Sequence, residues 1–273
     1  MKDKYEELCQ TADTANQAVS RLAEIVKVLR VECPWDKVQT HETLRECLIE
    51  ESYEVIEAIQ NHDVENLREE LGDVLLQVVF HASIEEENGA FDLCDVINEE
   101  CEKMIRRHPH VFLEESAKSI DKVLEKWENI KVKESGQQDH TSRLVKVPRS
   151  LPALMRAKKV QKKAADVGFD WDEITPALDK VREETSELRE AHSNRNEAAI
   201  KEELGDLLFS IVNVARFLSV DPEEALNFTT DKFIQRFAYM EKEALACGRR
   251  LEDMSLSEMD LLWDKAKENA GSL

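Results

Sequence analysis

A stretch of acidic and apolar residues occurs twice in the chain, at a constant separation of 133 residues. The sequence EESYEVIEA at 50–58 returns as EETSELREA at 183–191. Further along, LREELGDVLLQVVFHA at 67–82 returns as IKEELGDLLFSIVNVA at 200–215. Because both matches have the same offset, the spacing between the two segments is kept without a gap. The chain is therefore expected to fold as two similar units in tandem.

The seam between the repeats lies near residues 134–152, where the sequence is ESGQQDHTSRLVKVPRSLP. This stretch combines Gly136, a polar run, Pro148 and Pro152, which is typical of a linker. Outside it, Trp127 of the first repeat pairs with Trp263 of the second. We expect a first helical domain at 1–134, a linker at 135–152 and a second helical domain at 153–273.

Helices are the expected elements of both domains. The chain of 273 residues has only seven Gly and six Pro, which disfavours a turn-rich β fold. Within each repeat the apolar residues recur at three- and four-residue steps. Polar breaks at 61–63 and 193–196 predict that one helix turns back on the next, and Asp221-Pro222 predicts a helix start. The sequence thus predicts an all-α chain of two tandem helical bundles.

The charge and the cysteines limit the choice of partners and compartment. A net charge of −21 argues against a nucleic-acid polymer or an anionic membrane as the main partner. The six cysteines form no C-x-x-C pair, so we expect reduced, mostly buried thiols. No apolar segment is long enough to span a bilayer, and the N-terminus has no signal-like apolar core. The protein is expected in the cytoplasm.

Each repeat carries four carboxylates at helical spacing. Glu51 and Glu54 lie three residues apart and so share a helix face, as do Glu70 and Asp73 on the next helix. If these helices pack antiparallel, the four groups converge, which is costly unless a cation neutralises them. Oxygen ligands suit Mg²⁺, with Mn²⁺ as a substitute. The candidate ligands of the second repeat are Glu184, Glu187, Glu203 and Asp206.

The alternative to a metal site is a solvated acidic face, which is common in a chain with 58 acidic residues. Two features favour the metal site. Asp73 and Asp206 directly precede apolar runs, so they border the expected buried face. Gly72 and Gly205 each cost about 1 kcal/mol in a helix, which predicts a close approach beside the acids. A ferritin-like di-iron site is excluded, because no His follows a Glu by three positions.

The second repeat also carries cations and aromatic residues that could bind a nucleotide. Lys232 and Arg236 lie one helical turn apart and are suited either to hold a polyphosphate or to form a solvated pair. Trp171 and Trp263 are suited either to stack on a base or to pack in a core. The sequence by itself leaves both choices open.

These motifs together resemble the MazG family of all-α nucleoside triphosphate pyrophosphohydrolases. The resemblance covers nearly the whole chain outside the first dozen residues and the linker. In the first repeat it rests on CPWD at 33–36, LIEESYEV at 48–55 and RRHPHVF at 106–112. In the second it rests on VGFDWD at 167–172, KVREETSEL at 180–188, KEELGDLLF at 201–209 and DKFIQRF at 231–237.

The resemblance implies Mg²⁺-dependent hydrolysis of nucleoside and deoxynucleoside triphosphates to the monophosphate and pyrophosphate, in the upkeep of nucleotide pools. It also implies a homodimer whose sites are bordered by both subunits, with the second repeat as the main catalytic unit. The first repeat keeps all four of its carboxylates, so its activity stays open. Glu183, beside the first ligand, is a candidate base for the attacking water. The family places the substrate against Lys180, Lys201, Lys232, Arg236 and Trp263.

A helical scaffold without catalysis is the competing hypothesis. In that case the acids only solvate the surface and the repeats only dimerise. It predicts no stabilisation by Mg²⁺ and full tolerance of Glu203→Gln.

Overall fold

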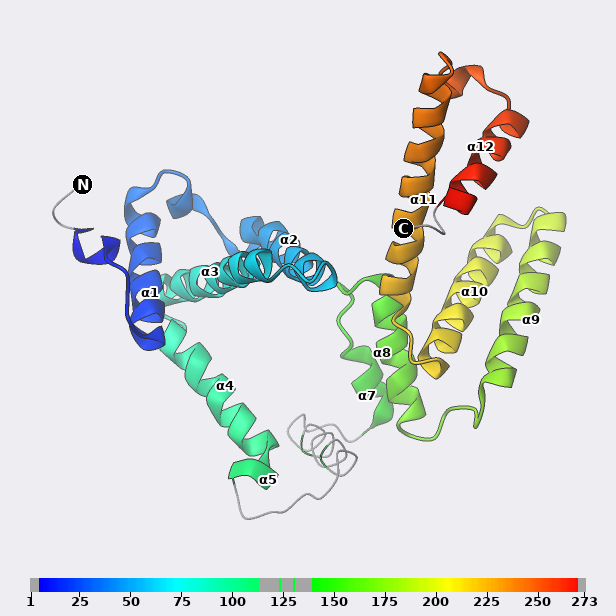
Figure 1. Cartoon of the computed structure of the whole chain (residues 1–273). Helices are drawn as coiled ribbons and strands as arrows, with labels where there is room; N and C mark the ends of the chain where they lie inside the picture. The colour runs from blue at the N-terminus through cyan, green and yellow to red at the C-terminus, as the bar shows by residue number, and fades with distance from the viewer. Residues whose placement is uncertain (1–4, 113–122, 124–129, 131–138, 270–273) are drawn as a thin grey trace. The chain divides into compact units, whose positions relative to one another are not determined.

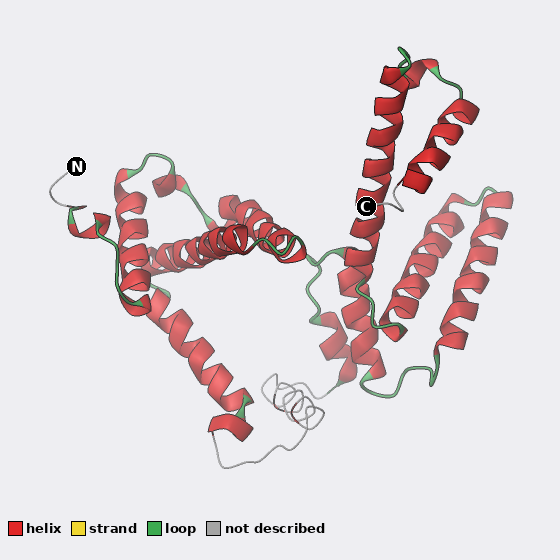
Figure 2. Cartoon of the chain, in the orientation of Figure 1, coloured by secondary structure: helices red, strands yellow, loops and turns green. Residues whose placement is uncertain are grey.

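Two helical units make up the chain. The computed structural model describes residues 5–112, 123, 130 and 139–269. Every regular element in these ranges is an α-helix or a short 3-10 helix, as Figure 2 shows. The chain divides into compact units at Met1–Glu134 and Ser135–Leu273 (Figure 1). The prediction of an all-α chain with two tandem domains is confirmed. Trp127, which the sequence paired with Trp263, lies outside the described residues.

The first unit is built around a long helix, α3, which packs against α1, α2 and α4. Its core is a cluster of buried apolar side chains in which Val26, Leu44 and Phe80 meet. The described helices of this unit are α1 (Ala15–Glu32), α2 (His41–Gln60), α3 (Val64–Asn88), α4 (Leu93–Arg107) and α5 (Pro109–Phe112), with 3-10 turns at Glu7–Cys9 and Asp36–Val38.

The second unit repeats the central hairpin, with α9 and α10 in the places of α2 and α3. Helix α8 packs against both α10 and α11, and α11 pairs with α12. Helix α7 lies inside the segment predicted as a linker and packs against α8. The described helices are α7 (His140–Val145), α8 (Ala153–Ala165), α9 (Ile174–Ser193), α10 (Glu197–Phe217), α11 (Pro222–Ala246) and α12 (Leu256–Asn269), with a 3-10 turn at Leu251–Asp253.

The same turn closes both central hairpins. His62 and Arg195, at equivalent positions, take left-handed backbone conformations with φ of 54° and 51°. The next residue in each case, Asp63 or Asn196, caps the following helix by accepting hydrogen bonds from its first backbone N–H groups. These are the two polar breaks that the sequence predicted. The turn brings the helices of each hairpin side by side, which places their acidic residues on facing surfaces.

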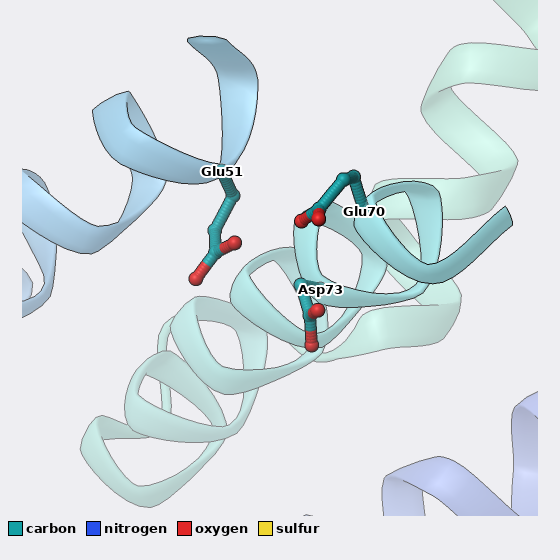
Figure 3. A group of neighbouring side chains, drawn as sticks. All are labelled: Glu51, Glu70 and Asp73. Carbon is teal, nitrogen blue, oxygen red and sulfur yellow. The ribbon is translucent and has the colours of Figure 1, made fainter. Parts of the chain in front are cut away.

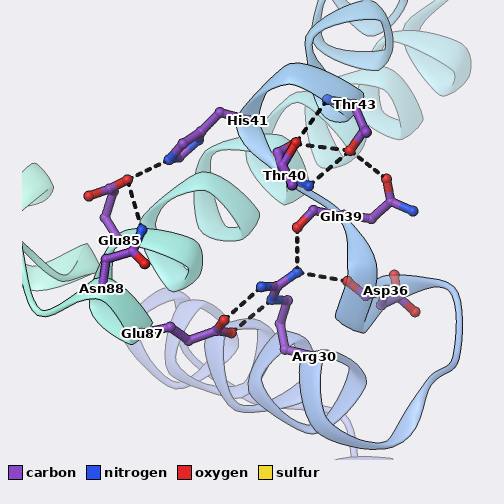
Figure 4. Close-up of polar contacts among 9 residues, drawn as sticks. All are labelled: Arg30, Asp36, Gln39, Thr40, His41, Thr43, Glu85, Glu87 and Asn88. Atoms are coloured by element: carbon purple, nitrogen blue, oxygen red, sulfur yellow. Dashed lines mark hydrogen bonds and ion pairs between the residues drawn. The ribbon is translucent and has the colours of Figure 1, made fainter.

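Arg30 holds the first hairpin to α1 (Figure 4). Its guanidinium donates hydrogen bonds to the carbonyls of Asp36 and Gln39, each at 2.8 Å, and forms an ion pair with Glu87 of α3 at 2.6 Å. The ion pair lowers the pKa of Glu87. Thr40 then caps α2 through a reciprocal pair of hydrogen bonds with Thr43. The loop before α2 is therefore fixed by polar contacts at both of its ends.

Many apolar side chains on the hairpin helices are not covered within the chain. On α10, Leu204 and Leu208 are each 47% exposed, and Ile211 is 46% exposed. On α11, Phe233 and Ile234 are more than half exposed. The helical spacing of these residues is as predicted, but their burial within one chain is not complete. No helix in the described ranges is both long enough and apolar enough to cross a membrane.

The prediction of mostly buried cysteines is wrong. All six are unpaired, and Cys9, Cys94, Cys101 and Cys247 are exposed. Cys94 and Cys101 lie on α4, which has no buried residue, and Cys9 and Cys247 lie in a 3-10 turn and at a helix end.

Candidate metal and nucleotide site

The second repeat gathers its acidic residues between α9 and α10. Glu184 and Glu187 lie three residues apart on α9, and Glu203 projects from α10. One carboxylate oxygen from each lies within 4.8 Å of the others. Glu184 is only 3% exposed, and a carboxylate is rarely buried this deeply unless it is paired. The convergence that helical spacing predicted is present for these three residues.

Asp206, the fourth predicted ligand, lies one turn beyond Glu203 on the same helix. It is exposed and falls outside the tight group of three, but it lines the same cavity as Glu184. Desolvation and the charges of Glu187 and Glu184 raise the pKa of Glu203, and Asp206 adds to this effect. Desolvation and the charges of Glu184 and Glu183 likewise raise the pKa of Glu187. The four residues therefore form one electrostatic cluster.

The first repeat forms the equivalent cluster from Glu51 of α2 with Glu70 and Asp73 of α3 (Figure 3). Their nearest carboxylate oxygens also lie within 4.8 Å of one another. Glu54 stands outside this group, yet its charge helps to raise the pKa of Glu70 after desolvation, the larger cause. Desolvation and the charge of Asp73 raise the pKa of Glu51.

Both clusters have the composition of a site for a hard divalent cation. Their ligand atoms are all carboxylate oxygens, which Mg²⁺ and Mn²⁺ prefer and which do not suit zinc or copper. Desolvation and, after it, repulsion between the negative charges raise the pKa values of acids in both clusters. A divalent ion would remove this repulsion, so the residues present fit such a group.

Lys180 places a positive charge against the second cluster. Its ammonium lies 2.9 Å from Glu183 and 2.6 Å from Glu184, one turn along α9. Hydrogen bonds to Glu183 and then Glu184 raise the pKa of Lys180, so it stays charged at neutral pH. Glu183 itself is exposed and points to Lys180, whereas the buried Glu184 belongs to both the ion pair and the acidic group.

A cavity of about 730 Å³ opens beside the second cluster. Glu184, Asp206 and Lys180 line one part of it, and Trp171 lines another. From the sequence, Trp171 was suited either to stack on a base or to pack in a core. In the structure it is 42% exposed and forms part of the cavity wall. Further lining residues that sequence reasoning missed are Gln161, Phe169, Phe209, Ser210 and Asn213.

The missed residues on α10 had a detectable pattern. Asp206, Phe209 and Asn213 follow one another at helical spacing, so they share one face with the predicted ligand. Gln161 had no such indication, because it lies on α8, far from the acidic motif in sequence. Its place in the cavity follows from the packing of α8 against α10.

The remaining predicted substrate residues lie elsewhere in the unit. Lys232 and Arg236 are on α11, with Lys232 over the ring of Phe228 at 5.6 Å and Arg236 over the ring of Trp263 at 5.7 Å. Neither these cations nor Trp263 line the cavity beside Glu184. Lys201 is exposed on α10, two residues before Glu203. A single chain thus brings the acids and Lys180 together, but not the cations of α11.

The expected role of the glycines beside the acids is wrong. A Cβ atom built on Gly72 or on Gly205 would meet no atom within 4 Å. No neighbour in the described part of the chain therefore requires glycine at either position, and the structure gives no physical reason for them.

The helical hairpins define the class of protein by its fold: an all-α protein built from two repeats, each with a cluster of carboxylates. The family model for the MazG nucleotide pyrophosphohydrolase domain matches residues 39–112 and again residues 174–240. The chain belongs to the MazG family.

Relatives of known name agree with this assignment. The chain is 48% identical to the nucleoside triphosphate pyrophosphohydrolase/pyrophosphatase MazG of Thermotoga maritima, over 86% of this chain and 89% of that protein. It is 44% identical to the nucleoside triphosphate pyrophosphohydrolase of Escherichia coli K12, over 91% of this chain and 97% of that protein. A crystal structure of a mazG-related protein from Thermotoga maritima matches at 35% identity, with a TM-score of 0.37, over 41% of this chain and 97% of that one.

Proposed function

We propose that this chain hydrolyses nucleoside and deoxynucleoside triphosphates to the monophosphate and pyrophosphate, with Mg²⁺ as cofactor and Mn²⁺ as a substitute. Family membership supports the class of enzyme. The observation that carries the proposal is that a carboxylate cluster and a cavity large enough for a nucleoside share the buried Glu184. Such an enzyme would act on the nucleotide pool of the cytoplasm, and the acidic surface disfavours a nucleic-acid polymer as substrate.

Glu184, Glu187, Glu203 and Asp206 would hold the metal in the second repeat. When bound, Mg²⁺ supplies positive charge for the phosphates and lowers the pKa of nearby water. The protein's own part is to gather the four acids in a single place and to keep Lys180 charged beside them. Lys180 and Lys201 would then orient the phosphates for attack by water at the α-phosphorus.

Glu183 would accept a proton from the attacking water. It neighbours the ligand Glu184 and is exposed to solvent, but it is paired with Lys180 at 2.9 Å in the absence of substrate. Phosphates that draw Lys180 away would free Glu183 for this task. The position of attack can be checked from the products, because attack at the α-phosphorus releases pyrophosphate and not orthophosphate.

The second repeat is the better candidate for the main catalytic unit, because two of the positions that line its cavity carry larger residues in the first repeat. Ala177 and Asn213 line the cavity in the second repeat. At the same repeat positions the first repeat has Leu44 and Phe80, which are 2% and 4% exposed and belong to its core. The carboxylates Glu51, Glu54, Glu70 and Asp73 would still bind a cation there.

A second copy of the chain would complete the site. Lys232, Arg236 and Trp263 are suited to hold the leaving pyrophosphate and the nucleotide, but they do not line the cavity of their own chain. The exposed apolar residues on α10 and α11 are the kind of surface that an obligate dimer covers. A homodimer in which α11 and α12 of one subunit border the acids of the other would satisfy both observations.

The test is hydrolysis of a panel of nucleoside and deoxynucleoside triphosphates with Mg²⁺, in an assay that resolves pyrophosphate from orthophosphate. Wild type, Glu70→Gln and Glu203→Gln are compared. We expect pyrophosphate from wild type and loss only in Glu203→Gln. If both variants fall partway, both repeats are catalytic. Release of orthophosphate would refute attack at the α-phosphorus, and no release at all would favour the helical scaffold.

A further inference from the structure

Gln161 carries an unpaired hydrogen-bond acceptor in the wall of the nucleotide cavity. The residue lies on α8 and is 7% exposed. Its amide nitrogen Nε2 donates a hydrogen bond of 2.8 Å to the backbone carbonyl of Phe209 on α10. Its amide oxygen Oε1 is buried and has no hydrogen-bond partner among the described residues.

The bond to Phe209 fixes which way the amide faces. A carbonyl oxygen can only accept a hydrogen bond, so the nitrogen must face it and the oxygen must face away. A reversed amide would place two oxygens together, which is unfavourable. Gln161 therefore presents an acceptor whose direction is set by the protein. Leaving a buried acceptor unpaired is costly, and such groups in native proteins usually serve a ligand or a water molecule.

The surroundings of Gln161 match one end of a nucleotide. The cavity that it lines also contains the flat apolar rings of Trp171 and Phe209, which suit the faces of a base. Glu184 and Asp206 line the same cavity and would mark the end for the phosphates. A nucleotide with its phosphates at these acids would have its base among the aromatic residues, where Gln161 offers a buried and unpaired acceptor.

We propose that Gln161 Oε1 accepts a hydrogen bond from an N–H group on the Watson–Crick edge of the substrate's base. This inference rests on the proposed nucleotide hydrolysis. Adenine and cytosine carry this donor on their amino groups, and guanine, uracil and thymine carry one on a ring nitrogen. Gln161 thus admits all common bases through a feature that they share, and it disfavours a base without such a donor.

Purine ribonucleoside 5′-triphosphate separates this proposal from its alternatives, because it is ATP with hydrogen in place of the amino group and has no N–H on that edge. We expect wild-type kcat/KM to be about tenfold lower for it than for ATP. Equal values would overturn the proposal, with a water molecule as the partner of Oε1. Failure to hydrolyse any triphosphate would instead refute the proposed function.

Gln161→Met removes the acceptor and keeps a side chain of similar size. We expect it to lower kcat/KM for ATP to the level of purine ribonucleoside triphosphate and to leave the latter nearly unchanged. An equal loss with both substrates would indicate a purely structural role and overturn the proposal. If the variant does not fold, the substrate comparison on wild type still decides.

Gln77 provides a matched control. It lies on α3 in the first repeat, is also 7% exposed, and also has a buried Oε1 without a partner among the described residues. It does not line the cavity of the second repeat. Gln77→Met is expected to keep the wild-type ratio of kcat/KM between the two substrates, whereas a change as large as that of Gln161→Met would contradict the proposal.

Discussion

At the scale of single residues, the carboxylates proposed to bind a metal are expected to lower the stability of the metal-free fold. Glu203 and Glu187 have raised pKa values because desolvation and neighbouring charges disfavour their ionised forms. An acid with a raised pKa in the folded chain makes folding less favourable once it ionises. The same negative charges are what a divalent cation needs. The site is therefore expected to destabilise the metal-free protein and to be relieved by the metal.

Glu203→Gln should raise the melting temperature of the metal-free protein at neutral pH. The gain should shrink as the pH falls towards 4.5, because wild-type Glu203 then becomes protonated and no longer repels its neighbours. In Mg²⁺ the order should reverse, since the variant has lost a ligand. Hydrolysis should fall by at least about 100-fold. Thermal melts with and without Mg²⁺ across this pH range test the expectation.

Glu202→Gln is the control for Glu203→Gln. It removes a neighbouring charge that also raises the pKa of Glu203, but no ligand of the cluster. It should raise the metal-free melting temperature slightly and keep the stabilisation by Mg²⁺. An undiminished Mg²⁺ effect in Glu203→Gln would contradict the role of Glu203 as a ligand.

Glu258 affects the pH dependence of stability in the opposite direction from Glu203, because its pKa is lowered. Its carboxylate pairs with Arg249 at 2.6 Å and accepts hydrogen bonds from Ser255 at the start of α12, which lowers its pKa to about 2. An acid with a lowered pKa stabilises the fold above its unfolded pKa, and this contribution is lost as the pH falls through the folded value. Glu258→Gln should therefore lower the melting temperature at neutral pH. The difference from wild type should narrow between pH 4.5 and about 2; a difference independent of pH would contradict the ion pair.

At the scale of elements, the two hairpins show how one motif supports two outcomes. Helices α2 and α9 are both 20 residues long, and each is followed by a turn residue in the left-handed conformation. The two hairpins also carry acids at the same positions. The two hairpins differ in the side chains on their inward faces, next to the acids. The first hairpin has Leu44 and Phe80 packed in the core with α1, and the second has Ala177 and Asn213 at the same positions beside a cavity. The local sequence determines that each hairpin forms, and the size of a few inward-facing side chains determines the space beside it.

Ala177→Leu combined with Asn213→Phe would give the second hairpin the residues of the first. The larger side chains should occupy the cavity and raise KM for nucleoside triphosphates by at least about tenfold. Stabilisation by Mg²⁺ alone should persist, because no carboxylate is changed. Steady-state kinetics and melts with Mg²⁺ measure the two effects separately.

The reverse change in the first hairpin is the control. Leu44→Ala truncates a core residue that is 2% exposed, and should lower the free energy of unfolding by about 2–5 kcal/mol. Since Leu44 lines no part of the cavity in the second unit, KM should not change. A change in KM without loss of stability would mean that the first repeat takes part in substrate binding.

At the scale of the whole molecule, the acidic cluster of α9 and α10 is separated from the predicted substrate-binding cations of α11, Lys232 and Arg236. Lys180 alone among the predicted substrate residues lines the cavity beside the acids. Arg236 and Trp263 contact each other on α11 and α12, and exposed apolar residues surround them. The proposed dimer, with sites shared between subunits, would account for both features.

Subunit complementation tests this arrangement. Glu203→Gln and Arg236→Ala should each be inactive as homodimers. When the two variants are co-expressed, each heterodimer has one site with neither change, so a statistical mixture should recover about a quarter of wild-type activity. Glu203→Gln co-expressed with Glu184→Gln should recover none. If heterodimers form but remain inactive, each site lies within one subunit.

The sequence by itself determined the helices, the repeat and the identity of the acids. These properties depend on residues three or four positions apart, and local spacing sets which residues share a helix face. It did not determine that Gln161 reaches the cavity, that Gly72 lacks a close neighbour, or that Leu204 and Leu208 stay exposed. Those outcomes depend on which helices pack together and how closely, and packing joins residues that are distant in the chain. The tertiary structure alone decided that the acidic cluster of the second repeat lies beside a cavity, while Leu44 and Phe80 of the first repeat pack into a core.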